Sequence, residues 1–161
     1  MPKSFVLHAT LVALALAGGS ALAAGKAEVS YVKPDNFSDA GRSSTDRDAT
    51  QKTLTAWLQK LALDLPDGQV LKVEVLDIDL AGEIRTDQLR EVRVLRGGAD
   101  WPRIQLRWTL AGPAGAASAG EAQLADMSYL QHISLGEAQN DTLAYEKRML
   151  QRWFKDTFAT H

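Results

Sequence analysis

Carboxylates spaced for a cation or for ion pairs lie in the stretch Leu71–Glu83, which reads LKVEVLDIDLAGE. Asp77 and Asp79 share one side of an extended chain, and Glu83 follows four residues later. Hard cations such as calcium and magnesium are bound by carboxylate oxygens. Asp77, Asp79 and Glu83 are therefore a candidate metal site, and a divalent cation is the only cofactor that the sequence suggests.

The match to a calcium-binding EF-hand loop is poor. A loop starting at Asp77 would have Ala81 at its fifth position and Gln88 at its twelfth, where a bidentate glutamate belongs. An irregular acidic site is the remaining metal hypothesis. Ion pairs between the two aspartates and arginines are the favoured alternative.

Arginines that could form such pairs lie in the alternating segment Trp101–Leu110. Arg103 and Arg107 share one face of this expected strand, because side chains alternate with a period of two. A bidentate arginine would satisfy Asp77 or Asp79 if the two strands are neighbours. The functional alternative is an anion-binding face built from Arg103 and Arg107, and structural pairing is favoured over it.

A second polar cluster, Tyr145-Glu146-Lys147, lies in the last expected helix. Glu146 could cross to an arginine on the sheet, and Lys147 could donate a proton if it is buried. The favoured interpretation is a surface charge pair on an amphipathic helix. Glu146 and Lys147 are kept with the residues above as candidates for ligand binding or ion pairing.

Catalytic motifs are scarce. The sequence has no cysteine, no G-x-S-x-G nucleophile motif, no histidine motif of the zinc-enzyme type and no glycine-rich phosphate loop. His132 and the terminal His161 are the only histidines after the first residues of the chain. The sequence therefore predicts no catalytic residue, although a carboxylate pair of the glycosidase type stays open, because its separation in space cannot be read from spacing.

Strands are predicted where apolar and polar residues alternate. Their ranges are Glu28–Lys33, Leu71–Leu80, Val92–Leu95, Trp101–Leu110 and, weakened by its alanines, Ala116–Asp126. The apolar side of the second strand changes near Leu76, which indicates either a β-bulge or a strand end covered on both faces. Thr86–Glu91 is polar and is expected to be a loop.

Two helices are predicted from apolar residues that recur every three or four positions. The first follows an N-cap at Ser44 or Thr45, carries Leu54, Trp57, Leu58, Leu61 and Leu65, and ends at Pro66-Asp67-Gly68. The second starts near Asn140 or Asp141 and carries Leu143, Leu150, Trp153, Phe154 and Phe158. Trp57 is expected to belong to the core rather than to a binding site.

The order β-α-β-β-β-β-α sets the expected architecture. The first β-α-β unit implies a parallel pair with a right-handed crossover, and the remaining strands read as a meander. Two helices on one face of such a sheet make a two-layer sandwich. The sequence thus predicts an α+β fold with a mixed, mostly antiparallel sheet of four to five strands, in a single domain over residues 24–161.

The first residues have the pattern of a cleaved export signal. Lys3 precedes the apolar run Leu11–Ala17, and Ala21-Leu22-Ala23 has the small-x-small form of a cleavage site. Residues 1–23 are therefore expected to be a signal peptide, with an apolar run too short for a membrane span. Export of a cysteine-free chain predicts a periplasmic protein of a Gram-negative bacterium, without a membrane span after processing.

The net charge is mild. The chain has 18 basic and 20 acidic side chains, a formal charge of −2, and loss of Lys3 changes this to −2 − 1 = −3. Nucleic-acid binding is not expected, because it requires a basic face.

Several short motifs follow one another in a distinctive order. They are Val29-x-Tyr31-x-x-Pro34-x-x-Phe37-x-Asp39, Asp77-x-Asp79-Leu80-Ala81-Gly82-Glu83, Pro102-Arg103-Ile104, Asp126-x-x-Tyr129 and Leu143-x-Tyr145-Glu146-Lys147-x-x-Leu150-x-x-Trp153. Together they resemble the proteobacterial proteins of domain-of-unknown-function family 3016. The resemblance covers nearly the whole mature chain and implies a small, exported, single-domain protein. It implies no activity and no catalytic residue.

These observations lead to two main hypotheses of function. The first is a non-enzymatic periplasmic protein that binds an envelope protein or polymer through the loop Pro34–Asp39 and the acidic turn Asp77–Glu83. The second is a small metal-dependent or carboxylate-based hydrolase that uses Asp77, Asp79, Glu83 and Arg103. A third is an envelope stress or storage protein with no specific ligand.

Overall fold

A computed structural model describes residues 24–87, 90–112, 115, 117–133, 141 and 143–158. The expected signal peptide, residues 1–23, and the candidate helix cap Asn140 lie outside the described residues. Among the described residues, no helix has the length and apolar character needed to cross a membrane.

Six strands and two long helices make up the described chain. In order they are β1 Lys26–Tyr31, the 3₁₀ turn η1 Pro34–Asn36, α1 Ser44–Ala62, β2 Val70–Asp79, β3 Glu83–Asp87, β4 Arg90–Val94, β5 Arg103–Ala111, β6 Ala117–Ala125, the 3₁₀ turn η2 Tyr129–Gln131 and α3 Ala144–Phe158. The first strand is therefore two residues earlier than the alternation predicted, because Tyr31 is its last residue and Lys33 has a left-handed backbone before Pro34.

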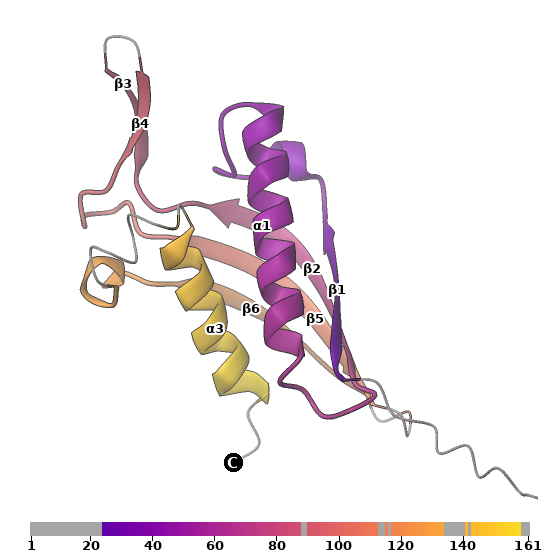
Figure 1. Ribbon diagram of the computed structural model, residues 1–161. Helices are drawn as coiled ribbons and strands as arrows, with labels where there is room; N and C mark the ends of the chain where they lie inside the picture. Colours follow the sequence, from indigo (N-terminus) through magenta and orange to yellow (C-terminus); the bar gives the residue numbers. More distant parts are fainter. Residues whose placement is uncertain are drawn as a thin grey trace, which may run out of the picture.

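Four strands form the main sheet in the order β1-β2-β5-β6. β1 is parallel to β2, whereas β2–β5 and β5–β6 are antiparallel. Helices α1 and α3 lie side by side on the same face of this sheet (Figure 1). The predicted α+β fold, with a mixed sheet of four to five strands and two helices on one face, is confirmed.

A β-bulge in β2 explains the change of apolar side near Leu76. Its pairing with β5 shifts in register between Val75 and Asp77. Val75 before the shift and Ile78 after it both face the core, at 2% and 0% exposure. The bulge therefore turns Asp77 and Asp79 to the face of the sheet opposite the helices.

In the segment expected to be a loop, Thr86–Glu91, the described residues belong instead to two paired strands. Strands β3 and β4 pair antiparallel in a separate two-stranded sheet, which stands away from the main sheet in Figure 1. The simple meander is also wrong, because β2 pairs with β5 across this insertion. The loop interpretation failed because a hairpin outside the main core needs no apolar alternation.

The cap of α1 lies one residue before the expected positions, whereas Asp141, one of the two expected caps, does bond at the start of α3. In α1, Ser43 rather than Ser44 or Thr45 is the N-cap, and it forms a capping box with Asp46. The helix α1 ends at Ala62, before the Pro66-Asp67-Gly68 segment where its end was expected. Before α3, the Asp141 side chain accepts a hydrogen bond from the Leu143 N–H at 3.1 Å.

The core lies between the helices and the sheet. It combines Leu71, Val73, Val75, Ile78, Ile104 and Leu106 from the sheet with Leu54, Leu58, Met149 and Leu150 from the helices. Trp57 packs against this cluster, as expected, and its indole N–H donates to the Lys147 carbonyl at 2.9 Å, which joins α1 to α3. This packing fixes the two helix starts at the same end of the molecule as the hairpin (Figure 1).

Candidate functional site

The loop after η1 and the acidic turn after β2 meet at one end of the sheet. Asp39 forms a parallel bridge with Asp79, and the Asp39 N–H donates to the Ile78 carbonyl at 2.8 Å. The backbone N–H and the hydroxyl of Ser38 both donate to the Asp77 carboxylate, each at 2.7 Å. The two segments proposed from sequence as one binding surface are therefore neighbours in space.

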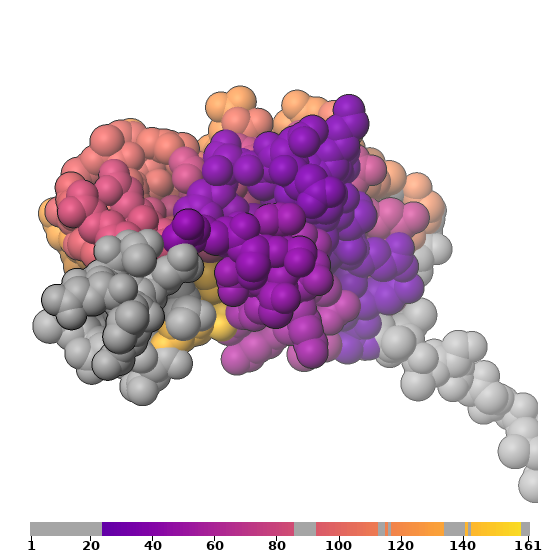
Figure 2. Space-filling view, turned by 90° about the horizontal axis from the view of Figure 1, so that it is seen from above, coloured from indigo at the N-terminus to yellow at the C-terminus, as the bar shows by residue number. Residues whose placement is uncertain are grey.

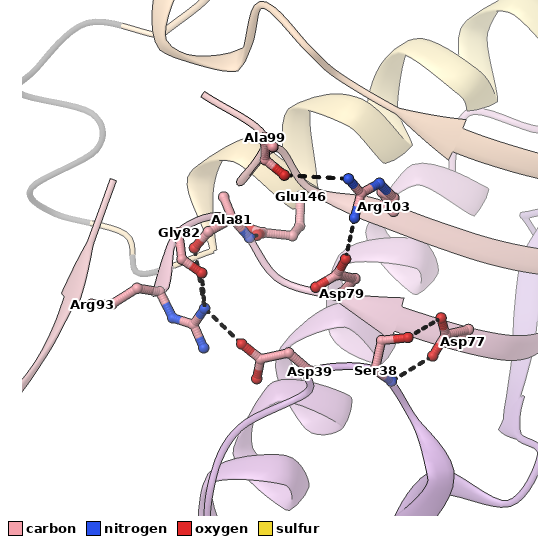
Figure 3. Close-up of polar contacts among 10 residues, drawn as sticks. All are labelled: Ser38, Asp39, Asp77, Asp79, Ala81, Gly82, Arg93, Ala99, Arg103 and Glu146. Atoms are coloured by element: carbon pink, nitrogen blue, oxygen red, sulfur yellow. Dashed lines mark hydrogen bonds and ion pairs between the residues drawn. The ribbon is translucent and has the colours of Figure 1, made fainter. Parts of the chain in front are cut away.

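Asp79 forms the arginine pair that the alternation predicted. Arg103 of β5 lies opposite Asp79 of β2, and its Nη1 donates to the Asp79 Oδ2 (Figure 3). The second arginine nitrogen donates to the Ala99 carbonyl at 3.3 Å, and the guanidinium carbon lies 4.7 Å from the centre of the Trp101 ring. Asp79 and Arg103 thus hold the loop before β5 against the acidic turn.

The other two carboxylates of the candidate metal site point elsewhere. Asp77 is held by Ser38, and Glu83 lies 3.6 Å from Arg85 on the same strand. In the described part of the chain, no group of three or more His, Cys, Asp or Glu side chains is placed to hold a metal ion. Asp77, Asp79 and Glu83 form no such group, and each has a protein partner.

Arg107 lies away from this end and does not join Arg103 in an anion-binding face. Its guanidinium pairs with Glu74 at 3.0 Å and with Glu121 at 2.9 Å on the open face of the sheet. The paired carboxylates raise the pKa of Arg107. Arg107 is therefore a cross-strand ion-pair residue in this structure.

Arg93 anchors the hairpin to the acidic turn. Its Nη1 donates to the Asp39 Oδ2 at 3.0 Å and to the carbonyls of Ala81 and Gly82, both at 3.1 Å (Figure 3). One guanidinium thus links β4, the loop after η1 and the turn after β2. The sequence did not identify Asp39 as the partner of Arg93, because the two residues lie 54 positions apart in the chain.

Glu146 is buried, which contradicts the expected surface charge pair. Its side chain is 2% exposed, and Oε1 accepts a hydrogen bond from the Ala81 N–H at 2.8 Å. Oε2 has no hydrogen-bond partner among the described residues. Burial raises the pKa of the Glu146 carboxyl above its usual 4.5, against the smaller lowering effects of the Ala81 N–H and the Arg93 charge.

Lys147 pairs with Asp141, which lies just before α3. Its Nζ lies 2.6 Å from the Asp141 Oδ2 and 5.8 Å from the centre of the Trp57 ring. The ammonium group is therefore engaged at the start of α3, where it offsets the charge of Asp141.

A cavity of about 590 Å³ lies where the two helix starts face the acidic turn and the hairpin. Its walls include Thr50 of α1, Leu80 after β2, Arg93 of β4 and Glu146 of α3. Figure 2 looks onto this end, where the start of α1 lies beside the hairpin region. Spacing within single elements did not identify this cavity, because its walls come from four separate segments.

Comparison with protein families gives one match. Residues 25–156 match the family described as protein of unknown function, DUF3016. The chain belongs to this family. Neither the curated proteins nor the solved structures contain a match to it.

Parts of three of the motifs that resembled the DUF3016 family meet at this end of the fold. Phe37–Asp39, Asp77–Glu83 and Leu143–Lys147 surround the cavity and an adjoining surface hollow of about 510 Å³. Asp126 lies next to Pro102, with its N–H donating to the Pro102 carbonyl at 3.3 Å. In this DUF3016 domain, segments that are far apart in the sequence therefore come together around the cavity and the hollow.

Proposed function

We propose that this chain is an exported, non-enzymatic binding protein that engages another protein of the cell envelope from the periplasm. The export pattern of residues 1–23 and the absence of cysteine support the compartment. The scarcity of catalytic motifs supports a binding role. The observation that carries the proposal is the joining of two separate loops into one surface at the end of the sheet.

This surface, called here the acidic surface, consists of Pro34–Asp39 and Asp77–Glu83. Ser38 and Asp39 fasten the two segments together through Asp77 and Asp79. A hollow of about 510 Å³ opens between them. Loops held rigidly by a sheet are the usual location of binding residues.

Exposed carboxylates on the rim indicate the chemistry of the partner. The side chains of Asp35 and Glu83 are 86% and 58% exposed. Asp35 accepts a hydrogen bond from Arg47 at 3.3 Å, and Glu83 lies 3.6 Å from Arg85. Ion pairs with carboxylates this exposed contribute little to stability. A partner with basic side chains would meet these carboxylates, which increases the rate of association more than the affinity.

The hydrolase alternative has no observation in its favour. Its proposed residues Asp77, Asp79 and Arg103 are engaged with Ser38 or with one another. These contacts hold the turn and the neighbouring strands together, which is a structural role.

Site-specific crosslinking in the periplasm tests the proposal. A photoreactive amino acid is placed at Asp35 or at Glu83, and for control at Lys72, which is 66% exposed on the open face of the sheet. We expect the same discrete protein adduct from both acidic-surface positions and none from Lys72. The adduct from position 35 should weaken when Glu83→Lys is added, and the adduct from position 83 should weaken when Asp35→Lys is added.

Equal adducts from all three positions, or none from any, would contradict the proposal. If the crosslinked product is heterogeneous in size and becomes uniform after the cell-wall polymer is digested, the partner is that polymer and not a protein. A thermal melt of each variant shows whether a lost adduct reflects lost folding.

A further inference from the structure

The main sheet has two outer strands, β1 and β6, which differ in how their free edges are protected (Figure 1). An edge strand presents a row of unpaired backbone groups, and charged side chains commonly keep such a row from pairing with another strand. β1 carries Lys26 and Glu28 among its six residues. β6, with the sequence ASAGEAQLA, has nine residues, of which Glu121 alone is charged. Within the described chain, β6 is therefore the longer and less protected edge.

The register of the sheet shows which backbone groups of β6 face outward. The Asp126 N–H donates to the Pro102 carbonyl, which places the even-numbered residues of β6 in hydrogen-bonded pairs with β5. The backbone groups that point away from the sheet are then those of Ala117, Ala119, Glu121, Gln123 and Ala125. No other described strand pairs with this edge.

The carboxylates along β6 are already paired within the chain. Glu121 Oε1 accepts a hydrogen bond from Arg107 at 2.9 Å, and Asp126 Oδ2 lies 2.9 Å from Arg152 Nη2. The remaining side chains of β6 are uncharged, and most are small. Another strand could therefore lie along this edge without burying an unpaired charge.

A second copy of β6 fits the edge in one antiparallel register. In this register Glu121 lies opposite Gln123 of the second copy, and the Gln123 amide can donate to the Glu121 carboxylate. Ala119 lies opposite Ala125 of the second copy, so both outward-facing pairs join hydrogen-bonding residues of the free edge. Ala122 lies opposite itself, at the two-fold axis of the junction.

The neighbouring registers fit less well. A shift in one direction places Glu121 opposite Glu121 of the second copy, and like charges directly opposite each other are destabilising. A shift in the other direction places Glu121 opposite Ala119, which offers no side-chain donor. The favoured register also sets Leu124 opposite Gly120, so a large side chain meets a position that has none.

We propose that two copies of this chain pair through β6, antiparallel and with Ala122 at the two-fold axis. The four strands of each copy then form one continuous sheet, in the order β1-β2-β5-β6 and its reverse. Such an interface is self-complementary, as a two-fold dimer requires. It is separate from the acidic surface, and either proposal can hold without the other.

The helices of both copies lie on the same side of this continuous sheet. Residues opposite one another in paired strands share a face, so the two copies of α3, which packs against β6, flank the junction. Exposed residues of α3 at successive turns are Arg148, Arg152, which reaches Asp126 at the end of β6, and Asp156. Two antiparallel copies of this helix side present charges of both signs to each other.

The mass of the protein in solution is the first test. One pair of strands is a small interface, so we expect a weak dimer of residues 24–161 whose sedimentation coefficient rises with concentration between about 10 µM and 1 mM. A mass of one copy throughout this range would leave the edge to a strand of another protein and would overturn the proposal.

Charge at position 123 tests the partner of Glu121. Gln123→Glu sets a carboxylate opposite Glu121 twice in each dimer and should weaken dimerisation by about three- to thirtyfold at low salt. Gln123→Lys should strengthen it by a similar factor. The same two changes at Gln105, which is exposed on β5 beside Gln123, should leave dimerisation within about twofold.

Disulfide trapping tests the register, because the chain has no cysteine of its own. Opposed residues of a non-hydrogen-bonded pair have Cα atoms about 4.5 Å apart, which is within the range of a disulfide. Under mild oxidation Ala122→Cys should form an intermolecular disulfide at least about tenfold faster than Glu121→Cys, although position 121 is the more exposed. Glu28→Cys, half exposed on β1, is the control for the other edge.

Two further results would overturn the proposal. One is a dimer whose stability does not respond to charge at position 123, or responds equally at position 105. The other is trapping at position 28 or 121 that is as fast as trapping at position 122. Thermal melts of the variants show that each is folded at the temperature of the assay.

Discussion

At the scale of single residues, Glu146 differs from the other acidic side chains. Asp77, Asp79 and Glu83 are partly or fully exposed and lie next to hydroxyl or arginine partners. Glu146 is 2% exposed and has one neutral donor, the Ala81 N–H. A carboxyl in such surroundings is held more easily as the neutral acid, because burial penalises charge.

The stability of the protein should therefore depend on the protonation of Glu146. Its pKa is raised in the folded state, so the folded protein keeps a proton that the unfolded chain loses above about pH 4.5. The free energy of unfolding should fall between that pH and the raised pKa, by up to about 1.4 kcal/mol per pH unit. Below pH 4.5 this contribution is fully present.

Glu146→Gln isolates this effect, because glutamine has the same shape and no titratable proton. Chemical denaturation across pH 4.5–8 should show the variant gaining stability relative to the parent as the pH rises. A difference that stays constant with pH would mean that Glu146 has an ordinary pKa in the folded protein. Asp35→Asn, at an exposed carboxylate, is the matched control.

The sequence was informative about residues whose partners lie on neighbouring strands. Alternation placed Arg103 and Arg107 on one face of a strand and offered Asp77 or Asp79 as a partner if the strands were neighbours, and the structure pairs Arg103 with Asp79. The partner of Asp77 could not be predicted in this way, because Ser38 lies in a loop 39 residues away. The burial of Glu146 was missed because the acidic turn covers a helix edge that reads as solvent-facing from periodicity alone.

At the scale of elements, the junction between β2 and the hairpin depends on Gly82. Its φ of 80° lies in the left-handed region, and an added Cβ would lie 2.6 Å from the Val94 carbonyl oxygen. Its N–H donates to the Asp100 carbonyl at 2.8 Å. The backbone can thus turn into the hairpin only without a side chain at this position.

Gly82→Ala should therefore be much more damaging than an alanine at another left-handed glycine. Gly115 has a φ of 77° and nothing within 4 Å of an added Cβ, so Gly115→Ala should cost only about 1–2 kcal/mol of backbone strain. Gly82→Ala adds overpacking, about 1–3 kcal/mol more. Urea denaturation of both variants measures the difference, and equal losses would show that the junction relaxes freely.

The attachment of the hairpin should depend on Arg93. Replacing it by glutamine removes a charged donor shared by Asp39, Ala81 and Gly82, which should cost about 1–2 kcal/mol. Amide hydrogen exchange should accelerate in β3 and β4 and stay slow in β2 and β5. Arg107→Gln is the control, because its ion pairs are half exposed and their loss should cost less than the loss of Arg93. Uniform acceleration across both sheets would contradict a local anchor.

Element prediction succeeded where packing against the main core imposes a period. The stripe through Leu54 and Leu58 identified α1, and the inverted alternation located the bulge in β2. It failed for the hairpin, because β3 and β4 pair with each other instead of covering the core. The position of the cavity was equally out of reach, since it depends on how four segments meet.

At the scale of the whole molecule, the two faces of the sheet have different roles. One face carries α1, α3 and the core, and the other carries charge pairs such as Lys72 with Glu28 and Arg107 with Glu74. Exposed pairs of this kind contribute little to stability. The proposed binding surface and the cavity lie at neither face but at the end of the sheet, where the helix starts and the hairpin meet.

Global stability also tests whether the acidic turn binds cations. A thermal melt of residues 24–161 with chelator, then with calcium, magnesium, manganese or zinc at about 10 mM, should show no cation-specific shift, because Asp77, Asp79 and Glu83 have separate protein partners. A site of millimolar affinity would add about 1.4 kcal/mol at tenfold excess and raise the melting temperature by roughly 2–4 °C. Sodium chloride of equal ionic strength controls for screening. A shift for one cation that disappears in Asp79→Asn would instead make the turn a metal site, in which Arg103 must move away to release the carboxylate.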